Sequence, residues 1–303
     1  MTLQLSDARS ELAAQLGLNQ TKSSTKTLLD RWLNFAYQDI AGAYPWSWIE
    51  NTDRVAMEVD LTTGTVDATA GSTTITFSSA PTASQVNRYI QFSSANDWYK
   101  ITAHTAASAT ATIDPAYVQS SNLSAGTFTI RTFFYSLAST VESAYSAKQA
   151  ISNVPISIIT AHTYDRNLAF PEDTGDPKVI YMWGRDSSEQ WQFSPFPWPS
   201  SAMIIEFKTI TTVTDLSNDT DKPLFPTRFN TVWLRGAKAY GYEFLDDDRS
   251  TRAFNRFEDR IDEMKKLDNV GLTRNYILEA VDEGRNDLRS TIPFPAAFGP
   301  IHD

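Results

Sequence analysis

The sharpest constraint on the fold is a change of composition near residue 61. Between Leu61 and Phe133 about half of the residues are Ser, Thr or Ala. β-Branched residues alternate with others over residues 74–77, 88–92 and 127–131, which is the period of half-buried strands. We therefore expect residues 61–133 to form a small antiparallel β-barrel or β-sandwich inserted into a host domain. Charged residues are sparse in this segment: Asp67, Arg88, Asp97, Lys100, Asp114 and Arg131.

The segments on either side of this insert carry helical patterns. Apolar residues recur every three or four positions over residues 5–16 and 28–40, which predicts two N-terminal helices. Pro45 ends the second pattern, and the Trp46 and Trp48 that follow are typical of a core corner. A longer helical pattern runs from Thr227 to about Leu267, with a break or restart expected at the aspartates of residues 246–248.

Residues 134–226 are mixed and interrupted by prolines. Short apolar runs at 156–159, 179–183, 191–193 and 203–207 predict strands, with proline at their ends. The predicted fold class is therefore α+β. We expect a discontinuous, helix-rich body with a small β-sheet region, the inserted β module, and an extended C-terminal arm; the limits are 1–60 with 134–273, 61–133, and 274–303.

The sequence lacks the motifs of most common catalytic and metal-binding sites. The absence of Cys excludes a thiol nucleophile, a Cys-ligated zinc site and a disulfide scaffold. His104, His162 and His302 form no HExxH pattern, and phosphate-loop, dinucleotide-binding and GxSxG motifs are absent. We accordingly predict no catalytic residue, no metal site, no cofactor and no enzyme activity.

The charge and hydropathy of the chain argue against nucleic acid and membrane as binding partners. A formal net charge of −10 argues against a dedicated nucleic-acid binder, and the excess acid is expected in and around the long C-terminal helix and the tail. The longest aliphatic stretch, Val154 to Ala161, is broken by Pro155 and is too short for a membrane span. We expect a soluble protein that is made in a cytoplasm and has no membrane partner.

An ordered set of short motifs provides a resemblance. A helix containing residues 33–41 ends in the turn Trp46-Ser47-Trp48 and is followed by Gly175-Asp176-Pro177 with Tyr181. A strand ending in Pro195-Phe196-Pro197 comes next, and then a long helix containing residues 236–240. In this order, over residues 1–60 and about 134–270, the chain resembles head-to-tail adaptor (connector) proteins of tailed bacteriophages, especially those of short-tailed phages. The insert is similar to small β modules of phage neck and tail proteins.

The resemblance implies a structural virion protein at the neck of the particle, assembled in the host cytoplasm. Such adaptors form a twelve-fold ring that joins the portal protein to a tail, nozzle or tail-fibre protein and extends a channel through which genomic DNA passes without specific binding. Their C-terminal segments reach the portal, so the predicted portal-binding residues are Tyr276, Ile277, Phe294, Phe298 and Ile301.

Ring closure also requires contacts between copies. A closed ring uses two different faces of each subunit, and the charged helix from Thr227 to Leu267 is the candidate for part of this interface or of the channel wall. The residues expected there are Arg249, Arg252, Arg256, Asp259, Arg260 and Glu263.

A second function remains open from the residues alone. The tryptophan content and the β insert also fit a carbohydrate-binding or glycan-degrading phage protein that recognises a receptor. Trp98 would then be a stacking residue, although no motif places two carboxylates beside a tryptophan.

Overall fold

The computed structural model describes residues 3–159 and 173–270. The chain divides into two compact units: one comprises the described residues of Met1–Ile49 and Val213–Asp303, and the other Glu50–Thr212. No helix in the described part has the length and apolar character needed to cross a membrane.

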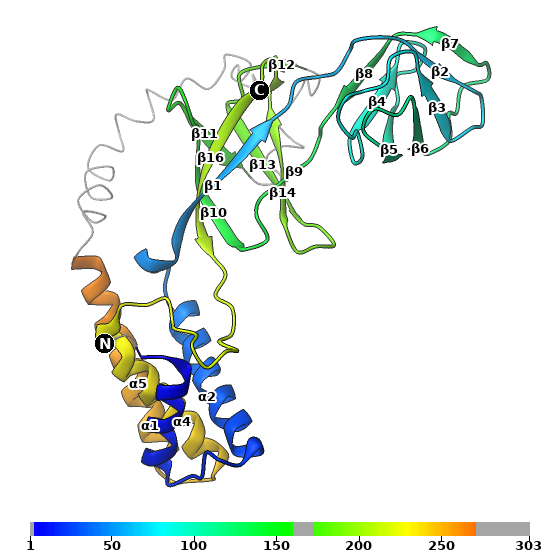
Figure 1. Cartoon of the computed structure of the whole chain (residues 1–303). Helices are drawn as coiled ribbons and strands as arrows, with labels where there is room; N and C mark the ends of the chain where they lie inside the picture. Colours follow the sequence, from blue (N-terminus) through cyan, green and yellow to red (C-terminus); the bar gives the residue numbers. More distant parts are fainter. Residues whose placement is uncertain (1–2, 160–172, 271–303) are drawn as a thin grey trace, which may run out of the picture. The chain divides into compact units, whose positions relative to one another are not determined.

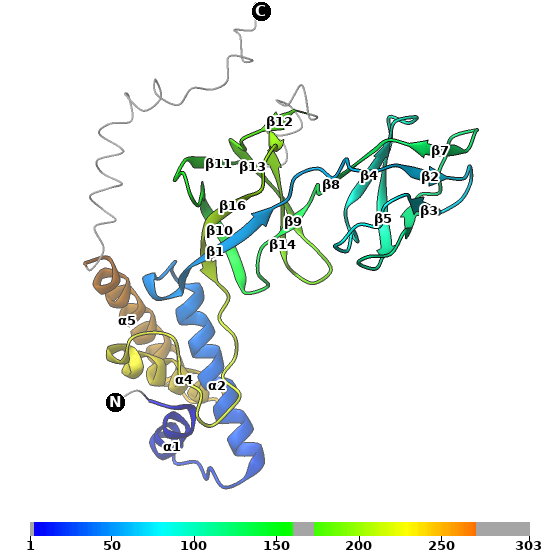
Figure 2. The ribbon, with the colours of Figure 1, turned by 45° about the horizontal axis from the view of Figure 1, so that its top comes forward.

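The first unit is a helical bundle (Figures 1 and 2). Its elements are α1 (Leu5–Leu16), α2 (Ser23–Gly42), η1 (Ser47–Ile49), η2 (Thr227–Phe229), α4 (Asn230–Phe244) and α5 (Ser250–Val270). α1 ends at Gly17, whose φ of +67° is the left-handed conformation that glycine adopts most readily. The expected break at the aspartates is confirmed, since α4 ends just before them and α5 begins just after them.

Helix α4 packs against the other three helices. Trp233 is fully buried, and its indole N–H donates to the Leu33 carbonyl of α2 at 2.8 Å. At Gly236 an added Cβ would lie 2.6 Å from the Phe257 ring of α5 and 2.8 Å from the Ala36 Cβ of α2. The absence of a side chain at this position therefore lets α4 approach both neighbours closely.

The tryptophan turn after α2 is a core corner, as predicted. Trp46 is fully buried, and its indole N–H donates to the Ile40 carbonyl at 2.6 Å. Trp48 stacks on it at a centroid separation of 6.0 Å. The buried carboxylate of Asp268 accepts hydrogen bonds from both the backbone N–H and the hydroxyl of Ser47, at 2.9 and 2.6 Å, which ties the end of α5 to this turn.

The second unit contains two seven-stranded sheets and one two-stranded sheet. The strands of its first sheet are β1 (Glu50–Met57), β9 (Tyr135–Ser136), β10 (Val141–Gln149), β11 (Pro155–Ile159), β13 (Val179–Arg185), β14 (Trp191–Phe196) and β16 (Met203–Thr211). They lie in the order β1-β16-β10-β11-β13-β14-β9, antiparallel except for the pair β11 and β13. β12 (Thr174–Gly175) and β15 (Trp198–Pro199) form the short parallel pair.

A cross-strand ion cluster connects three neighbouring strands of this sheet. Glu206 of β16 accepts hydrogen bonds from Arg54 of β1, the closer at 2.8 Å, and lies 3.3 Å from the Lys148 ammonium of β10. The Arg54 hydrogen bonds outweigh desolvation and, with Lys148, lower the pKa of Glu206. The carboxylate therefore stays ionised on a side chain that is almost buried.

The insert forms the second large sheet. Its strands are β2 (Val66–Ala68), β3 (Thr74–Phe77), β4 (Tyr89–Phe92), β5 (Trp98–His104), β6 (Thr110–Asp114), β7 (Leu123–Gly126) and β8 (Phe128–Arg131), in the order β7-β2-β3-β6-β5-β4-β8. All of its pairs are antiparallel, as predicted for this segment. The two edge strands, β7 and β8, are separated by Thr127 alone, so the sheet curves around its own core.

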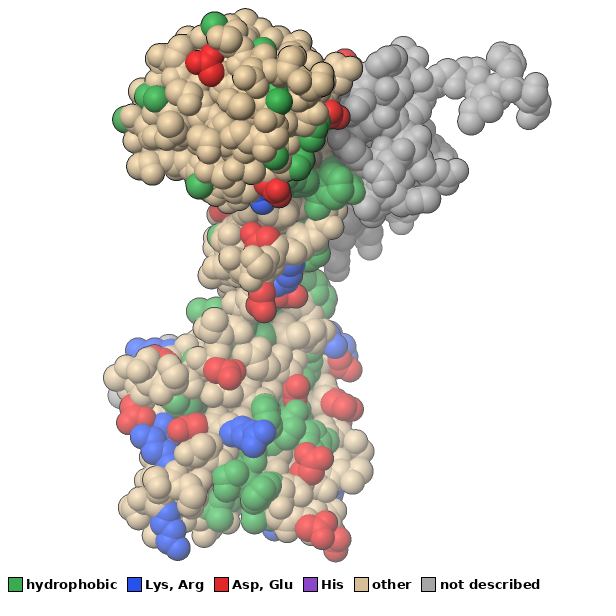
Figure 3. Space-filling model, turned by 90° about the vertical axis from the view of Figure 1, so that its right-hand side faces the viewer, with side chains coloured by type: hydrophobic (Ala, Val, Ile, Leu, Met, Phe, Trp, Pro, Cys, Tyr) green, Lys and Arg blue, Asp and Glu red, His purple; other side chains and the backbone are tan. Residues whose placement is uncertain are grey.

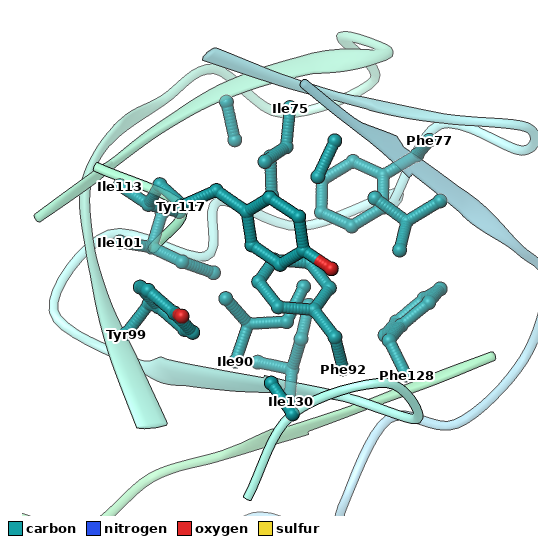
Figure 4. Close-up of a cluster of buried hydrophobic side chains, with 14 residues drawn as sticks. Ile75, Phe77, Ile90, Phe92, Tyr99, Ile101, Ile113, Tyr117, Phe128 and Ile130 are labelled. Carbon is teal, nitrogen blue, oxygen red and sulfur yellow. The ribbon is translucent and has the colours of Figure 1, made fainter. Parts of the chain in front are cut away.

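Aromatic and aliphatic side chains fill the insert core (Figure 4). Phe92 lies at its centre, with ring centroids 5.3 Å from Tyr99 and 5.2 Å from Tyr117. Alternate residues of β3 and β4 point into this core, and the polar residues between them point outward. The Ser/Thr alternation of the sequence thus corresponds to the outer face of a closed, one-sided sheet.

Arg131 joins the insert to the short parallel pair of β12 and β15. Its guanidinium lies 5.3 Å from the ring centroid of Trp98 in β5 and 5.5 Å from that of Trp198 in β15. It also pairs with Asp60, with Nη2 and Oδ2 2.7 Å apart, and its side chain is 7% exposed. Phe133 packs against both tryptophans, with ring centroids 4.9 and 5.1 Å away. The junction is therefore a packed core with a buried cation.

The predicted fold class is wrong. The described part contains sixteen strands and four α-helices, so the protein is mostly β rather than a helical body with a small sheet. Residues 50–60 and 134–212 share a compact unit with the insert, not with the helices. Strand β1, with sequence ENTDRVAM, shows no alternation, and its partner β16 lies far along the chain. Local periodicity could not reveal a strand whose burial depends on that distant pairing. The predicted domain limits (1–60 with 134–273, 61–133, and 274–303) stay a prediction.

The close approach at Gly236 predicts a specific cost. Substituting G236A places a methyl group against Phe257 and Ala36 and should lower the free energy of unfolding by about 1–3 kcal/mol. The matched control is G42A in α2, where no atom lies within 4 Å of an added Cβ. That variant should be neutral or more stable by up to about 1 kcal/mol. Urea unfolding followed by circular dichroism compares the two, and equal effects would contradict the packing argument.

The junction predicts a second difference. R131M keeps an unbranched apolar stem but removes the guanidinium and leaves Asp60 with a largely buried, unpaired carboxylate, so it should cost about 3 kcal/mol. The control is R185M, because Arg185 also pairs with a carboxylate (Glu142) and stacks on a tryptophan (Trp191) but is 32% exposed. Its expected cost is about 1 kcal/mol or less. A smaller loss for R131M than for R185M in the same denaturation assay would refute a buried role for Arg131.

Candidate interaction surfaces

Basic side chains gather in a groove of the helical unit, which we call the basic groove. It has a volume of about 660 Å³. α4 contributes Arg235, Lys238 and Tyr242, which follow one another along one face of the helix. The other lining residues are Gln15 of α1 and, from α5 and the turn before it, Arg249, Arg252, Ala253, Arg256, Asp259, Arg260 and Glu263.

Two arginines of the basic groove are paired within the unit. Arg249 donates to Asp247, with Nη2 and Oδ2 2.5 Å apart, and Arg260 donates to Glu263. The Arg249 hydrogen bonds lower the pKa of Asp247 to about 2, and the same pair raises the pKa of Arg249.

The remaining cations of the basic groove have no carboxylate partner in the described part of the chain. Arg235, Lys238, Arg252 and Arg256 make no ion pair there. Lys238 and Arg249 instead flank Tyr242, at 5.5 and 4.5 Å from its ring centroid. The groove therefore offers several guanidinium groups to an external carboxylate or phosphate.

The expected excess of acid on the long helix is wrong, because residues 227–267 contain nine Lys and Arg against eight Asp and Glu. α5 contains five cations and five carboxylates: Arg252, Arg256, Arg260, Lys265 and Lys266 against Glu258, Asp259, Asp262, Glu263 and Asp268. The helix is neutral as a whole, and three of its arginines, Arg252, Arg256 and Arg260, line the groove. The insert has the uncharged surface that its composition indicated, and Figure 3 shows few charged side chains on the face in view.

Apolar side chains of α2 and α4 enclose a second hollow, which we call the apolar patch. It measures about 300 Å³ and is lined by Leu28, Arg31, Trp32, Phe35, Tyr240, Glu243 and Phe244. Phe35 is 41% exposed and Phe244 60% exposed. Figure 3 shows apolar side chains gathered among charged ones on the face of the helical unit in view. Exposed aromatic groups of this size are typical of surfaces that contact other proteins.

A hydrogen bond between α4 and α2 holds Tyr240 in place at the apolar patch. The Tyr240 hydroxyl donates to Asp39 at 2.5 Å, and its ring lies 5.4 Å from that of Phe35. Burial, followed by the hydrogen bond to the Asp39 carboxylate, raises the pKa of Tyr240. Tyr240 therefore remains a neutral donor that holds α4 against α2.

The structure brings together all six residues that the sequence assigned to a subunit interface or channel. Arg249, Arg252, Arg256, Asp259, Arg260 and Glu263 line the basic groove, and their role in assembly stays a prediction. The five predicted portal-binding residues, Tyr276, Ile277, Phe294, Phe298 and Ile301, lie outside the described residues.

Sequence reasoning missed the contribution of α4 to the basic groove. Arg235, Lys238 and Tyr242 recur at three- and four-residue spacing, which is the same signal that identifies an apolar stripe. The same helical spacing, applied to polar residues as well as apolar ones, identifies these three side chains as one face of the helix. Among residues 3–159 and 173–270, no group of three His, Asp or Glu residues could hold a metal ion.

A charged groove and an exposed aromatic patch on one small bundle are features typical of proteins that contact other macromolecules. The comparison with known families agrees. The chain matches the SU10 adaptor protein family over residues 3–277 and belongs to that family. It is thus a phage structural adaptor. No curated protein matches the chain.

The Arg249–Asp247 pair predicts a measurable titration. In R249Q the pKa of Asp247 should rise from about 2 toward the ordinary value of about 3.9, because the charged donor is lost. NMR of selectively labelled aspartate side chains, assigned with D247N, measures this shift. R252Q is the control and should leave the pKa of Asp247 unchanged. Because the folded-state pKa is the lower one, the pair stabilises the fold above pH about 4 and loses this contribution as pH falls toward 2. An Asp247 pKa near 3.9 in the wild type would contradict the pairing.

Proposed function

We propose that the protein is a head-to-tail adaptor of the short-tailed-phage type. Copies of the chain form a ring, expected to be twelve-fold, that joins the portal protein to a tail, nozzle or tail-fibre protein at the neck of the virion. The observation that carries this proposal is the family match over residues 3–277, which covers nearly the whole chain. The function is structural, assembled in the host cytoplasm, and involves neither catalysis nor a cofactor.

The helical unit supports the proposal with a surface suited to repeated contacts. Copies in a ring touch through two unlike faces, and this unit offers a basic groove and an apolar patch as distinct faces. Genomic DNA would pass through the channel of the ring without sequence-specific binding, since contacts to the phosphate backbone carry no sequence information.

No observation favours the carbohydrate-binding alternative. Trp98 packs between Phe133 and Arg131 at the junction of the insert, with ring and guanidinium contacts of 4.9 and 5.3 Å. Trp46 is fully buried and Trp48 stacks on it. The tryptophans that suggested sugar stacking therefore have protein partners on their ring faces.

The C-terminal arm gives the decisive experiment. Co-expression of the full chain with the portal protein of the same phage should yield portal particles with an added ring in negative-stain micrographs. Deleting residues 274–303 should abolish this ring, because the apolar residues proposed to dock are removed, while the circular dichroism of the body stays unchanged.

Two further variants locate the contact within the arm. F294A/F298A/I301A should lose docking as the deletion does, whereas R285A/R289A removes two arm charges and should dock normally. A truncation after residue 277, where the family match ends, separates Tyr276 and Ile277 from the Pro- and Phe-rich end. Equal docking of the 274–303 deletion and the full chain would refute the arm contact, and bare portal rings with the full chain would refute the adaptor role.

A further inference from the structure

Helix α4 presents two exposed faces on opposite sides. Tyr242 lines the basic groove and Tyr240 lines the apolar patch. Two positions along an α-helix correspond to a rotation of about 200°, so these side chains leave the helix on nearly opposite sides. One rigid helix therefore separates two surfaces of different chemistry.

The two faces differ in charge, although the exposed Arg31 of α2 lines the apolar patch together with Glu243. The basic groove presents the unpaired Arg235, Arg252 and Arg256. The other face and the turn that follows α4 carry Glu243, Asp246 and Asp248, which are exposed and make no ion pair in the described part of the chain. Exposed Phe244 and Leu245 lie among these carboxylates, at 60% and 47% exposure.

This arrangement suits an unlike-face contact between copies of the chain. A symmetric dimer through the basic groove would bring guanidinium groups against guanidinium groups, which is electrostatically unfavourable. A contact of one copy's groove with the next copy's carboxylates pairs opposite charges and covers Phe244. Contacts of this head-to-tail kind close into rings.

The composition of the basic groove favours a protein partner over nucleic acid. Asp259 and Glu263 lie in its lining, and such carboxylates would repel the oxygens of a phosphate backbone. The same carboxylates can accept hydrogen bonds from a protein surface. Arginine forks bind carboxylates in a bidentate geometry, so Arg252 and Arg256 fit Glu and Asp partners.

We infer that the basic groove of one copy receives the acidic and apolar side of α4 from a neighbouring copy, with Arg235, Arg252 and Arg256 meeting Glu243, Asp246 and Asp248 around Phe244. This contact rests on the proposed ring and names the surfaces that close it. It assigns a role to α4, in addition to the α5 residues that line the groove.

The absence of Cys allows a clean test by cross-linking of the full chain. A253C places a thiol in the basic groove, and L245C places one on the acidic and apolar side. On portal particles under mild oxidation, each single variant should stay unlinked, an equimolar mixture of the two should give a linked dimer, and the A253C/L245C double variant should give a ladder of higher species. Abundant homodimers from either single variant, or a mixture that stays unlinked on portal-bound rings, would overturn the inference.

Charge reversal tests the pairing itself. In the A253C/L245C background, R252E/R256E should lower the linked fraction about tenfold, because like charges then face each other. E243K/D248K should do the same, and mixing the two reversed proteins should restore linkage between them. K22E/K222E reverses two exposed cations outside both surfaces and should leave linkage unchanged. Failure of the reversed pair to restore linkage would contradict direct pairing.

Two readouts on the same samples separate this inference from the proposed function. Portal docking in micrographs reports the adaptor role, and linkage reports the contact between copies. Docked rings without linkage would overturn the inference alone, while bare portals would overturn the proposed function. Fluorescence anisotropy with a labelled DNA duplex completes the test: salt-sensitive binding that R252E/R256E abolishes, with linkage unaffected, would assign the groove to nucleic acid instead.

Discussion

The position of α4 determines most of what the helical unit can do. The helix lies so close to α2 and α5 at Gly236 that a single methyl group there would overlap both neighbours. Trp233 fixes the same helix through its bond to the Leu33 carbonyl, and Tyr240 fixes it through Asp39. Gly236 and Trp233 occupy the inner side of α4, whereas Arg235 and Lys238 line the basic groove and Tyr240 and Phe244 line the apolar patch. The two interaction surfaces are thus consequences of how one helix packs, rather than separate features of the chain.

The β unit differs from the helical unit because its two large sheets have separate hydrophobic cores. Arg131 lies where the insert meets the short pair of β12 and β15: its side chain is buried, its charge is paired with Asp60, and its guanidinium lies over the rings of Trp98 and Trp198. A buried guanidinium needs such complete satisfaction, because an unpaired charge in this position would be costly. The insert itself has few charges and an outer face of Ser and Thr, so it adds polar surface without adding to the charge of the particle. An adaptor can carry such a module without altering the electrostatics of its helical contacts.

The sequence predicted those elements whose burial follows a local period. The stripes of α1, α2 and the α4–α5 region were visible, as were β3, β4 and β8 of the insert. The first sheet was underestimated because β1 and β10 are rich in polar residues and gain their place by pairing with β16 on either side. The sequence of a short polar strand carries no hydrophobic pattern that would reveal its pairing with a distant strand. The six charged residues of the groove, Arg249 and five of α5, were predicted from their charge, but the balance of charge was misjudged, because summing residues along a helix does not show which of them share a face.

That last point explains how an acidic chain can present a basic site. The net charge of −10 is a property of the whole sequence, whereas a contact responds to charges within about 8 Å at physiological salt. On α5 cations and carboxylates are equal in number, but three arginines and only two carboxylates, Asp259 and Glu263, line the groove, and Asp262 pairs with Lys265 outside it. Like net charge keeps free copies apart at long range, and opposite local charge favours them once they are aligned. A surface with charges distributed in this way disfavours random aggregation and favours one orientation, as the proposed ring of identical subunits requires.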